Sequence, residues 1–146
     1  MTAQQQRVVV VGIDGSDQSL VALRRAVEEA RLRDAEAHVV HVADVTPAML
    51  HLPGDVTIDT VDLAAVQRKA VWEKAKPVLS VSNVRIKRVD LDGYPADALV
   101  DYCDQTKADL LVMGTRGRGR LSSTFLGSTS LRALERAHCD VLIAKG

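Results

Sequence analysis

Apolar, β-branched runs alternate with amphipathic runs along the 146-residue chain, and this alternation limits the possible fold more than any other feature. The first apolar run, Arg7 to Ile13 (RVVVVGI), is continuously apolar at its centre. Such a run is typical of a strand that is buried on both faces, as in a parallel sheet. The segment that follows, Gln18–Arg33, places Leu20, Leu23 and Val27 on one helical face.

The same order of strand and helix continues to the end of the chain. Val84 to Leu91 alternates apolar and polar residues, which indicates a strand nearer the edge of the sheet. Pro77 is expected to kink or end its helix, because proline removes a helix hydrogen bond. The other expected strands are Ala37–Val45, Asp109–Met113 and Val141–Ala144, and the other expected helices begin near Asp59–Asp62, at Ala96 and at Ser128.

This pattern predicts an α/β fold in which residues 1–146 form one domain, with a parallel sheet between two layers of helices and right-handed crossovers. In such sheets, ligands bind beyond the carboxyl ends of the strands, where the strand order reverses. The turn at Asp14 and the loop at Gly114 both follow strands. We therefore expect both at that edge.

The composition excludes several classes of protein. The formal net charge is zero and aromatic residues make up 3%, so we expect no binding to nucleic acid. No apolar run approaches the roughly 20 residues of a membrane span, and Val8–Val11 is too short for a signal-peptide core. Cys103 and Cys139 fit no metal or redox spacing and are expected to be reduced and largely buried. These features predict a cytoplasmic protein without membrane contact.

The loop after the strand Asp109–Met113 carries the clearest functional signal. It contains Gly114, Arg116 and Gly117, and after nine intervening residues it reaches Gly127-Ser128-Thr129-Ser130 at a helix start. Glycines let backbone N–H groups approach phosphate oxygens, and the positive end of a helix favours negative charge. A long surface turn is the structural alternative. The combination of glycines, arginines and hydroxyls favours a phosphate-binding loop, in which Arg116 could add charge-assisted hydrogen bonds.

The loop has neither of the two best-known phosphate-binding patterns. A Walker loop requires a Gly-Lys pair, which the chain does not contain, and Gly12 to Asp17 lacks the G-x-G-x-x-G spacing of dinucleotide-binding proteins. Asp14 follows the first strand and can be interpreted in two ways. It is either a turn or capping carboxylate, or a group that accepts hydrogen bonds from a ribose or an adenine edge.

Catalytic and metal-binding patterns are missing from the sequence. The four histidines are scattered, no Cys/His cluster exists, and no serine has a G-x-S-x-G setting. Without a paired nucleophile and base, no catalytic residue is assigned.

The spacing Gly114-x2-Gly117-x9-Gly127-Ser128 resembles the nucleotide-binding signature of the universal stress protein family. VVVVGIDGSDQS, HVVHVADV and CDVLIAKG resemble the first, second and closing strands of that family, and the resemblance extends from about Arg7 to Ala144. It implies a five-stranded parallel sheet of order 3-2-1-4-5. It also implies a homodimer that forms through the last strands, here Val141 to Ala144.

The resemblance further implies an ATP-binding member of the family. Gly12, Ile13 and Asp14 would border the adenosine, and Val42 would present backbone groups to adenine. The ribose and phosphates would be contacted by Met113, Gly114, Arg116, Gly117, Gly127, Ser128, Thr129 and Ser130. The predicted function is an ATP-dependent regulatory or stress-response role. The alternatives are a slow ATPase or phosphotransferase, with Mg²⁺ on the triphosphate, and a binding module for AMP or cyclic AMP.

Overall fold

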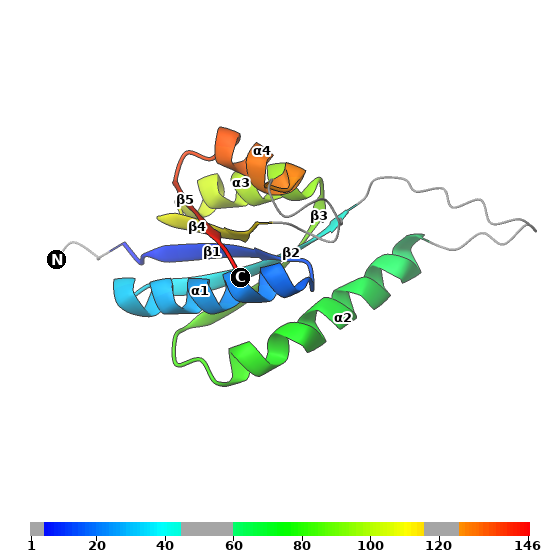
Figure 1. The fold of residues 1–146 in the computed structure, drawn as a ribbon, viewed down its shortest axis with the longest axis horizontal. Coiled ribbons are helices and arrows are strands. Elements are labelled where there is room, and N and C mark those ends of the chain that lie inside the picture. Colours follow the sequence, from blue (N-terminus) through cyan, green and yellow to red (C-terminus); the bar gives the residue numbers. More distant parts are fainter. Residues whose placement is uncertain (1–4, 45–59, 116–125) are drawn as a thin grey trace, which may run out of the picture.

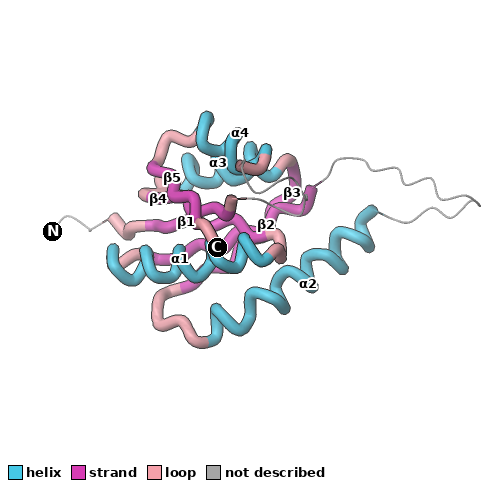
Figure 2. Tube along the Cα trace, in the orientation of Figure 1, coloured by secondary structure: helices cyan, strands magenta, loops and turns pink. Residues whose placement is uncertain are grey.

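The computed structural model describes residues 5–44, 60–115 and 126–146, which form a parallel β-sheet between two layers of helices (Figures 1 and 2). The strand order is β3-β2-β1-β4-β5, and every neighbouring pair is parallel. Both findings confirm the predicted fold. The strands are β1 (Val8–Ile13), β2 (Glu36–Asp44), β3 (Ile86–Gly93), β4 (Leu110–Gly114) and β5 (Asp140–Ala144).

Within the described ranges, four helices lie in the connections between these strands, and two of them cover each face of the sheet (Figure 1). Helices α1 (Asp17–Arg33) and α2 (Thr60–Ser80) lie on one face, and α3 (Pro95–Thr106) and α4 (Ser128–Arg136) lie on the other (Figure 1). No helix in the described ranges is long and apolar enough to cross a membrane.

Strand β1 lies at the centre of the sheet because its residues are apolar on both faces. Val9 and Val11 pack with the core that α1 and α2 cover, whereas Val8 and Val10 pack with the core beneath α3 and α4. Val9, Val10 and Val11 are fully buried. Burial of one such side chain contributes about 1.5–3 kcal/mol, so this single strand joins the two cores strongly.

The local sequence pattern was sufficient to predict the position of the edge strand β3, but it was not sufficient to predict where α2 ends. Strand β3 is an edge strand, as its alternating sequence predicts. Of the two predicted effects of Pro77, ending the helix was wrong, because α2 continues to Ser80, and a kink stays a prediction. Leu79 is buried in the core and holds this last turn in place, while the Ser80 hydroxyl donates to the carbonyl of Pro77.

Candidate functional site

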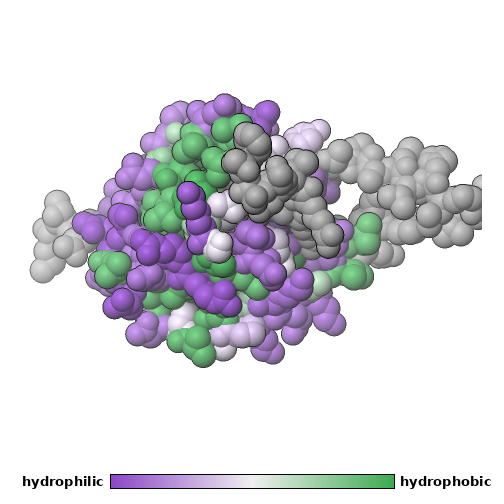
Figure 3. All heavy atoms as spheres, in the orientation of Figure 1, coloured by the Kyte–Doolittle hydropathy of each residue, from purple (hydrophilic) through white to green (hydrophobic). Residues whose placement is uncertain are grey.

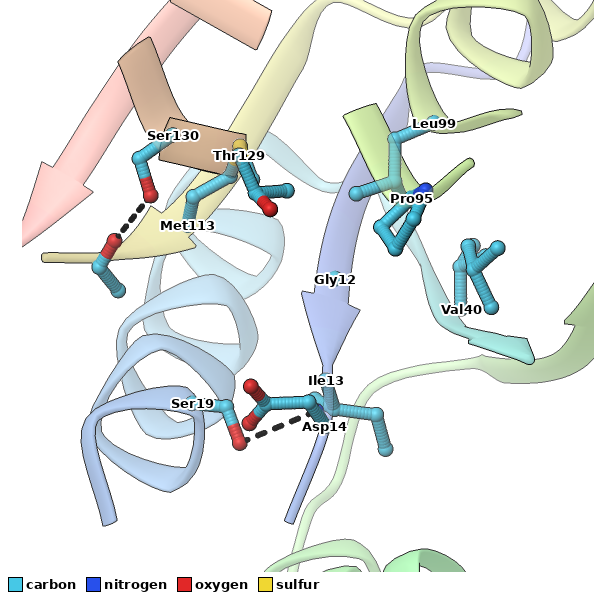
Figure 4. A pocket seen from close by; sticks show the side chains of 12 residues that line it. Gly12, Ile13, Asp14, Ser19, Val40, Pro95, Leu99, Met113, Thr129 and Ser130 are labelled. Atoms are coloured by element: carbon cyan, nitrogen blue, oxygen red, sulfur yellow. Dashed lines mark hydrogen bonds between the residues drawn. The ribbon is translucent and has the colours of Figure 1, made fainter. Parts of the chain in front are cut away.

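A pocket lies at the carboxyl ends of β1 and β4, which are neighbours in the sheet. The chain leaves β1 through α1 on one face and leaves β4 toward α4 on the other, so the strand order reverses here. The pocket has a volume of about 110 Å³. It is lined by Gly12, Ile13, Asp14, Ser19, Val40, Val42, Pro95, Leu99, Met113, Gly114, Thr129 and Ser130 (Figure 4).

One wall of the pocket is the turn from β1 into α1, which hydrogen bonds hold in place. The Asp14 carboxylate accepts from the Ser16 amide at 2.9 Å and from the Ser16 hydroxyl at 2.5 Å. Ser16 is the N-cap of α1, and its hydroxyl oxygen accepts from the Ser19 amide at 3.2 Å. Gly15 has a φ of +81°, which favours glycine. Asp14 therefore has the structural role in the turn, and it also lines the pocket.

Helix α2 supports the same turn from outside the pocket. The Lys74 ammonium donates to the Gly15 carbonyl at 3.1 Å. Val71, one turn earlier in α2, is buried and lies close to the Cα of Gly15, where an added Cβ would be 3.3 Å from its Cγ2. The position of Asp14 thus depends on a contact with a helix that itself does not line the pocket.

The interior of the pocket is apolar. Val40, Leu99 and Met113 are buried, and Figure 4 shows Leu99 and Pro95 across the pocket from Met113. Gly12 allows α3 to approach β1, because a Cβ at this position would lie 2.8 Å from Leu99 Cδ1. A flat, largely apolar ring system is the kind of group that such a surface accommodates.

The second wall is the start of α4. Gly127 is its N-cap and has no side chain to accept from the first amides of the helix. The Gly127 amide donates to the Thr115 carbonyl at 2.7 Å, and the buried Ser130 hydroxyl donates to the Gly114 carbonyl at 2.8 Å. These two bonds fasten the helix start to the end of β4. Thr129 lies between Gly127 and Ser130 in the sequence, and its side chain lines the pocket (Figure 4).

Gly114 has a structural requirement that the sequence did not reveal. A Cβ at this position would lie 2.7 Å from the backbone oxygen of Gln18 in α1. Glycine at the end of β4 is therefore needed for the contact with α1, whatever the pocket binds.

An ion-pair cluster joins α4 to α3 beside the pocket. Arg132 donates to both Asp97 oxygens, at 3.0 and 3.2 Å, and Arg136 also contacts this carboxylate. The pKa of Asp97 is lowered, mainly by the hydrogen bond from Arg132. Because these groups are exposed, each pair contributes little to stability. The cluster nevertheless orients α4, whose first turn forms the pocket wall.

The structure brings most of the predicted site residues together. Gly12, Ile13, Asp14, Val42, Met113, Gly114, Thr129 and Ser130 all line the pocket. Gly127 and Ser128 adjoin it at the start of α4 without lining it. Arg116 and Gly117 lie outside the described residues.

Sequence reasoning missed Ser19, Val40, Pro95 and Leu99, which also line the pocket. Two of them had detectable signals. Val40 is two residues before Val42 on the same strand and must point to the same face. Ser19 is three residues after the N-cap Ser16, where helix-start side chains commonly face the preceding turn.

Comparison with known proteins gives a consistent result. The sequence model of the universal stress protein family matches residues 6–145. A universal stress protein of Methanocaldococcus jannaschii is 36% identical over 138 residues, which cover 94% of this chain and 81% of that relative.

Solved structures with the same fold include two that were determined with nucleotides. A universal stress protein in complex with cAMP is 30% identical, has a TM-score of 0.71 and covers 96% of this chain and 97% of the other. A universal stress protein from Archaeoglobus fulgidus in complex with dAMP is 25% identical, has a TM-score of 0.70 and covers 96% and 98%.

Proposed function

Because the chain belongs to the universal stress protein family, we propose that residues 1–146 form one domain that binds an adenine nucleotide, ATP, in the pocket between β1 and β4. The observation that carries this proposal is the pairing of two different walls at one switch point. An apolar interior suits a base, and a helix start without a side-chain cap suits phosphates.

The pocket residues divide the ligand into three parts. Val40, Val42 and Leu99 would contact the adenine ring, and the Asp14 carboxylate would accept hydrogen bonds from ribose hydroxyls. The pocket volume of about 110 Å³ is below the roughly 300 Å³ of a typical small-molecule site. The phosphates would therefore extend outward, to the amides and hydroxyls of Ser128–Ser130.

The role that we propose is regulatory. Phosphates bound to the start of α4 would hold that helix in one position relative to β4 and α3. A ligand shifts an equilibrium only when it binds one state better than the other, so the nucleotide must favour one position of α4. Partner affinity would then depend on occupancy. Equal partner affinity with and without saturating ATP would contradict the regulatory role without affecting the binding site.

We also propose that the protein forms a homodimer through β5. This strand is at the edge of the sheet, and Val141, Leu142 and Ile143 on it are partly exposed. Leu131 and Leu134 of α4 are 47% and 45% exposed, and Figure 3 shows apolar side chains gathered in the region of α4 and β5. Pairing would cover this edge. Sedimentation analysis should show a dimer for the wild-type protein and a monomer for Val141→Lys.

A nucleotide monophosphate is the second candidate ligand, and a specific observation favours it. The two related structures described above were determined with cAMP and dAMP. Competition calorimetry with ATP, AMP and cyclic AMP separates the candidates. If the start of α4 holds several phosphates, ATP should bind at least about tenfold more tightly than AMP, which corresponds to about 1.4 kcal/mol.

Native mass spectrometry of the freshly purified protein tests nucleotide binding directly. We expect a bound adenine nucleotide and a lower affinity for Thr129→Val, which removes one hydroxyl from the pocket wall. Thr106→Val is the matched control, because Thr106 is the last residue of α3, away from the pocket, and its hydroxyl donates to the backbone carbonyls of Tyr102 and Cys103. A protein that is purified empty and does not bind millimolar ATP, AMP or cyclic AMP would refute the proposal.

A further inference from the structure

Two cysteines that are distant in sequence meet at the edge of the sheet opposite the pocket. Cys103 lies in the last turns of α3 and is 3% exposed, and Cys139 lies in the bend just before β5 and is partly exposed. The bend passes the carboxyl end of α3 in Figure 1. Both residues line one surface hollow of about 430 Å³, and Cys139 is close enough to influence the pKa of Cys103.

The flanking residues hold the two thiol-bearing segments together. His138 Nδ1 lies 3.1 and 3.2 Å from the carboxylate oxygens of Asp104. Asp104 follows Cys103 in the sequence and His138 precedes Cys139, so this contact holds the two cysteine-bearing segments side by side. The Ala108 amide donates to the Cys103 carbonyl at 2.9 Å and fixes the end of the helix. The two cysteines therefore lie at one junction between the end of α3 and the start of β5, and hydrogen bonds fasten this junction.

The two thiols differ in reactivity. Burial raises the pKa of Cys103, and the neighbouring Cys139 raises it further. Burial also raises the pKa of Cys139, but the adjacent Cys103 side chain opposes that change. Since Cys139 is also the more exposed of the two, it is the thiol that reacts first with a molecule from solvent.

We propose that Cys103 and Cys139 form a dithiol site that a peroxide oxidises to a reversible intramolecular disulfide. The Cys139 sulfur attacks one peroxide oxygen, which breaks the O–O bond and gives a sulfenic acid and one water from hydrogen peroxide. The Cys103 sulfur then attacks the sulfenic sulfur, the S–S bond forms, and the hydroxyl leaves as a second water. The thiols lose two electrons and two protons, and the peroxide is reduced. This proposal is independent of nucleotide binding.

The test uses the full chain and hydrogen peroxide. The reduced protein is treated with a modest excess, quenched with catalase and alkylated with N-ethylmaleimide before intact-mass and peptide analysis. We expect a product two hydrogen atoms lighter that takes up no label, and a peptide pair that joins Cys103 to Cys139. Dithiothreitol should restore two labelled thiols. The oxidised protein should also unfold about 5–10 °C higher, because the bond closes a long loop.

Two variants identify the roles of the sulfurs. Cys139→Ser should leave Cys103 largely unoxidised, whereas Cys103→Ala should form a Cys139 sulfenic acid that dimedone traps. The wild-type measurement stands even if Cys103→Ala fails to fold. Two alkylated thiols after peroxide, or a disulfide only between chains, would overturn the proposal. A lower unfolding temperature of the oxidised protein would contradict the claim that the native fold places the sulfurs for bonding.

Discussion

Helices α1, α3 and α4 begin at the edge of the pocket, and the starts of α1 and α4 are built differently. Helix α1 is capped by Ser16, has Asp17 in its first turn and is preceded by Asp14, which bonds to the cap. Helix α4 has Gly127 as its N-cap and so lacks a side-chain cap, and no acidic residue lies in its first turn. The positive end of α1 is therefore neutralised within the chain. The start of α3 also lacks a side-chain cap, but Asp97 lies in its first turn. In the described part of the site, the start of α4 is therefore the one that has neither a side-chain cap nor an acidic residue and can receive an external anion.

The comparison shows that a helix start near a ligand edge is not enough to predict a phosphate site. What distinguishes α4 is the residue at its cap. Gly127 has a φ of −62°, so its backbone conformation does not require glycine. A side chain could cap this helix, and its absence leaves room and hydrogen-bond donors for a ligand.

The largest expected effect concerns the strand ends beside the two helix starts. Gly114→Ala should lower the free energy of unfolding by about 2–3 kcal/mol, because its Cβ would meet the rigid backbone of Gln18. Gly12→Ala is the matched change on β1 and should cost about 1 kcal/mol or less, since the Leu99 side chain can move. Urea unfolding of both variants measures the difference. Equal costs would show that the α1 contact does not constrain Gly114.

Capping α4 should make it resemble α1. Gly127→Asp supplies a carboxylate to the first amides, and we expect a gain of about 0.5–1 kcal/mol in stability. The same carboxylate repels phosphates, so ATP affinity should fall by about tenfold or more. Gly127→Ser is the neutral control and should weaken binding less. Calorimetry that finds unchanged affinity for Gly127→Asp would remove α4 from the phosphate site.

The same substitution at the two helix starts should have unequal effects on the nucleotide-free protein. Ser16→Ala removes the α1 cap and should cost about 1 kcal/mol of stability. Ser128→Ala changes an exposed side chain in the first turn of α4 and should change stability by less than about 0.5 kcal/mol. Chemical unfolding in the absence of ATP checks both values, and a larger loss for Ser128→Ala would reverse the comparison.

The smallest expected effect concerns His38, which lies outside both helix starts and makes the stability of the whole fold depend on pH. Burial lowers the pKa of His38 below 6.5, Glu36 opposes this and Lys87 adds to it. As the pH falls below 6.5, His38 therefore binds a proton in the unfolded chain before it does so in the folded protein. Stability that is present above that pH should decline through the pKa of the folded state, by at most about 1.4 kcal/mol per unit of pKa difference. A pH series of unfolding measurements should show a flatter profile for His38→Gln.

Much of the fold could be predicted from the sequence because the strands carry their own signal. Val8–Val11 is apolar on both faces, and only a central parallel strand buries such a run. The strand order came from family resemblance instead, and the structure confirms it. Helix α2 continues past Pro77 because the burial of Leu79, a tertiary contact, outweighs the tendency of proline to end a helix.

The candidate site was predictable where its residues follow strands, and less so elsewhere. Pro95 and Leu99 reach the pocket through the packing of α3, which no local pattern encodes. The contact between Cys103 and Cys139 also depends on tertiary structure, since their sequence spacing fits no known motif. The cytoplasmic location and the roles of Arg116 and Gly117 stay predictions.

The hydrogen bond from the Gly127 amide to the Thr115 carbonyl has a consequence for protein engineering. It joins the residue that follows β4 to the cap of α4, so the second wall of the pocket is fastened directly to the end of that strand. Thr115 and Gly127 should therefore be kept unchanged as fixed anchor points when other residues near the pocket are redesigned.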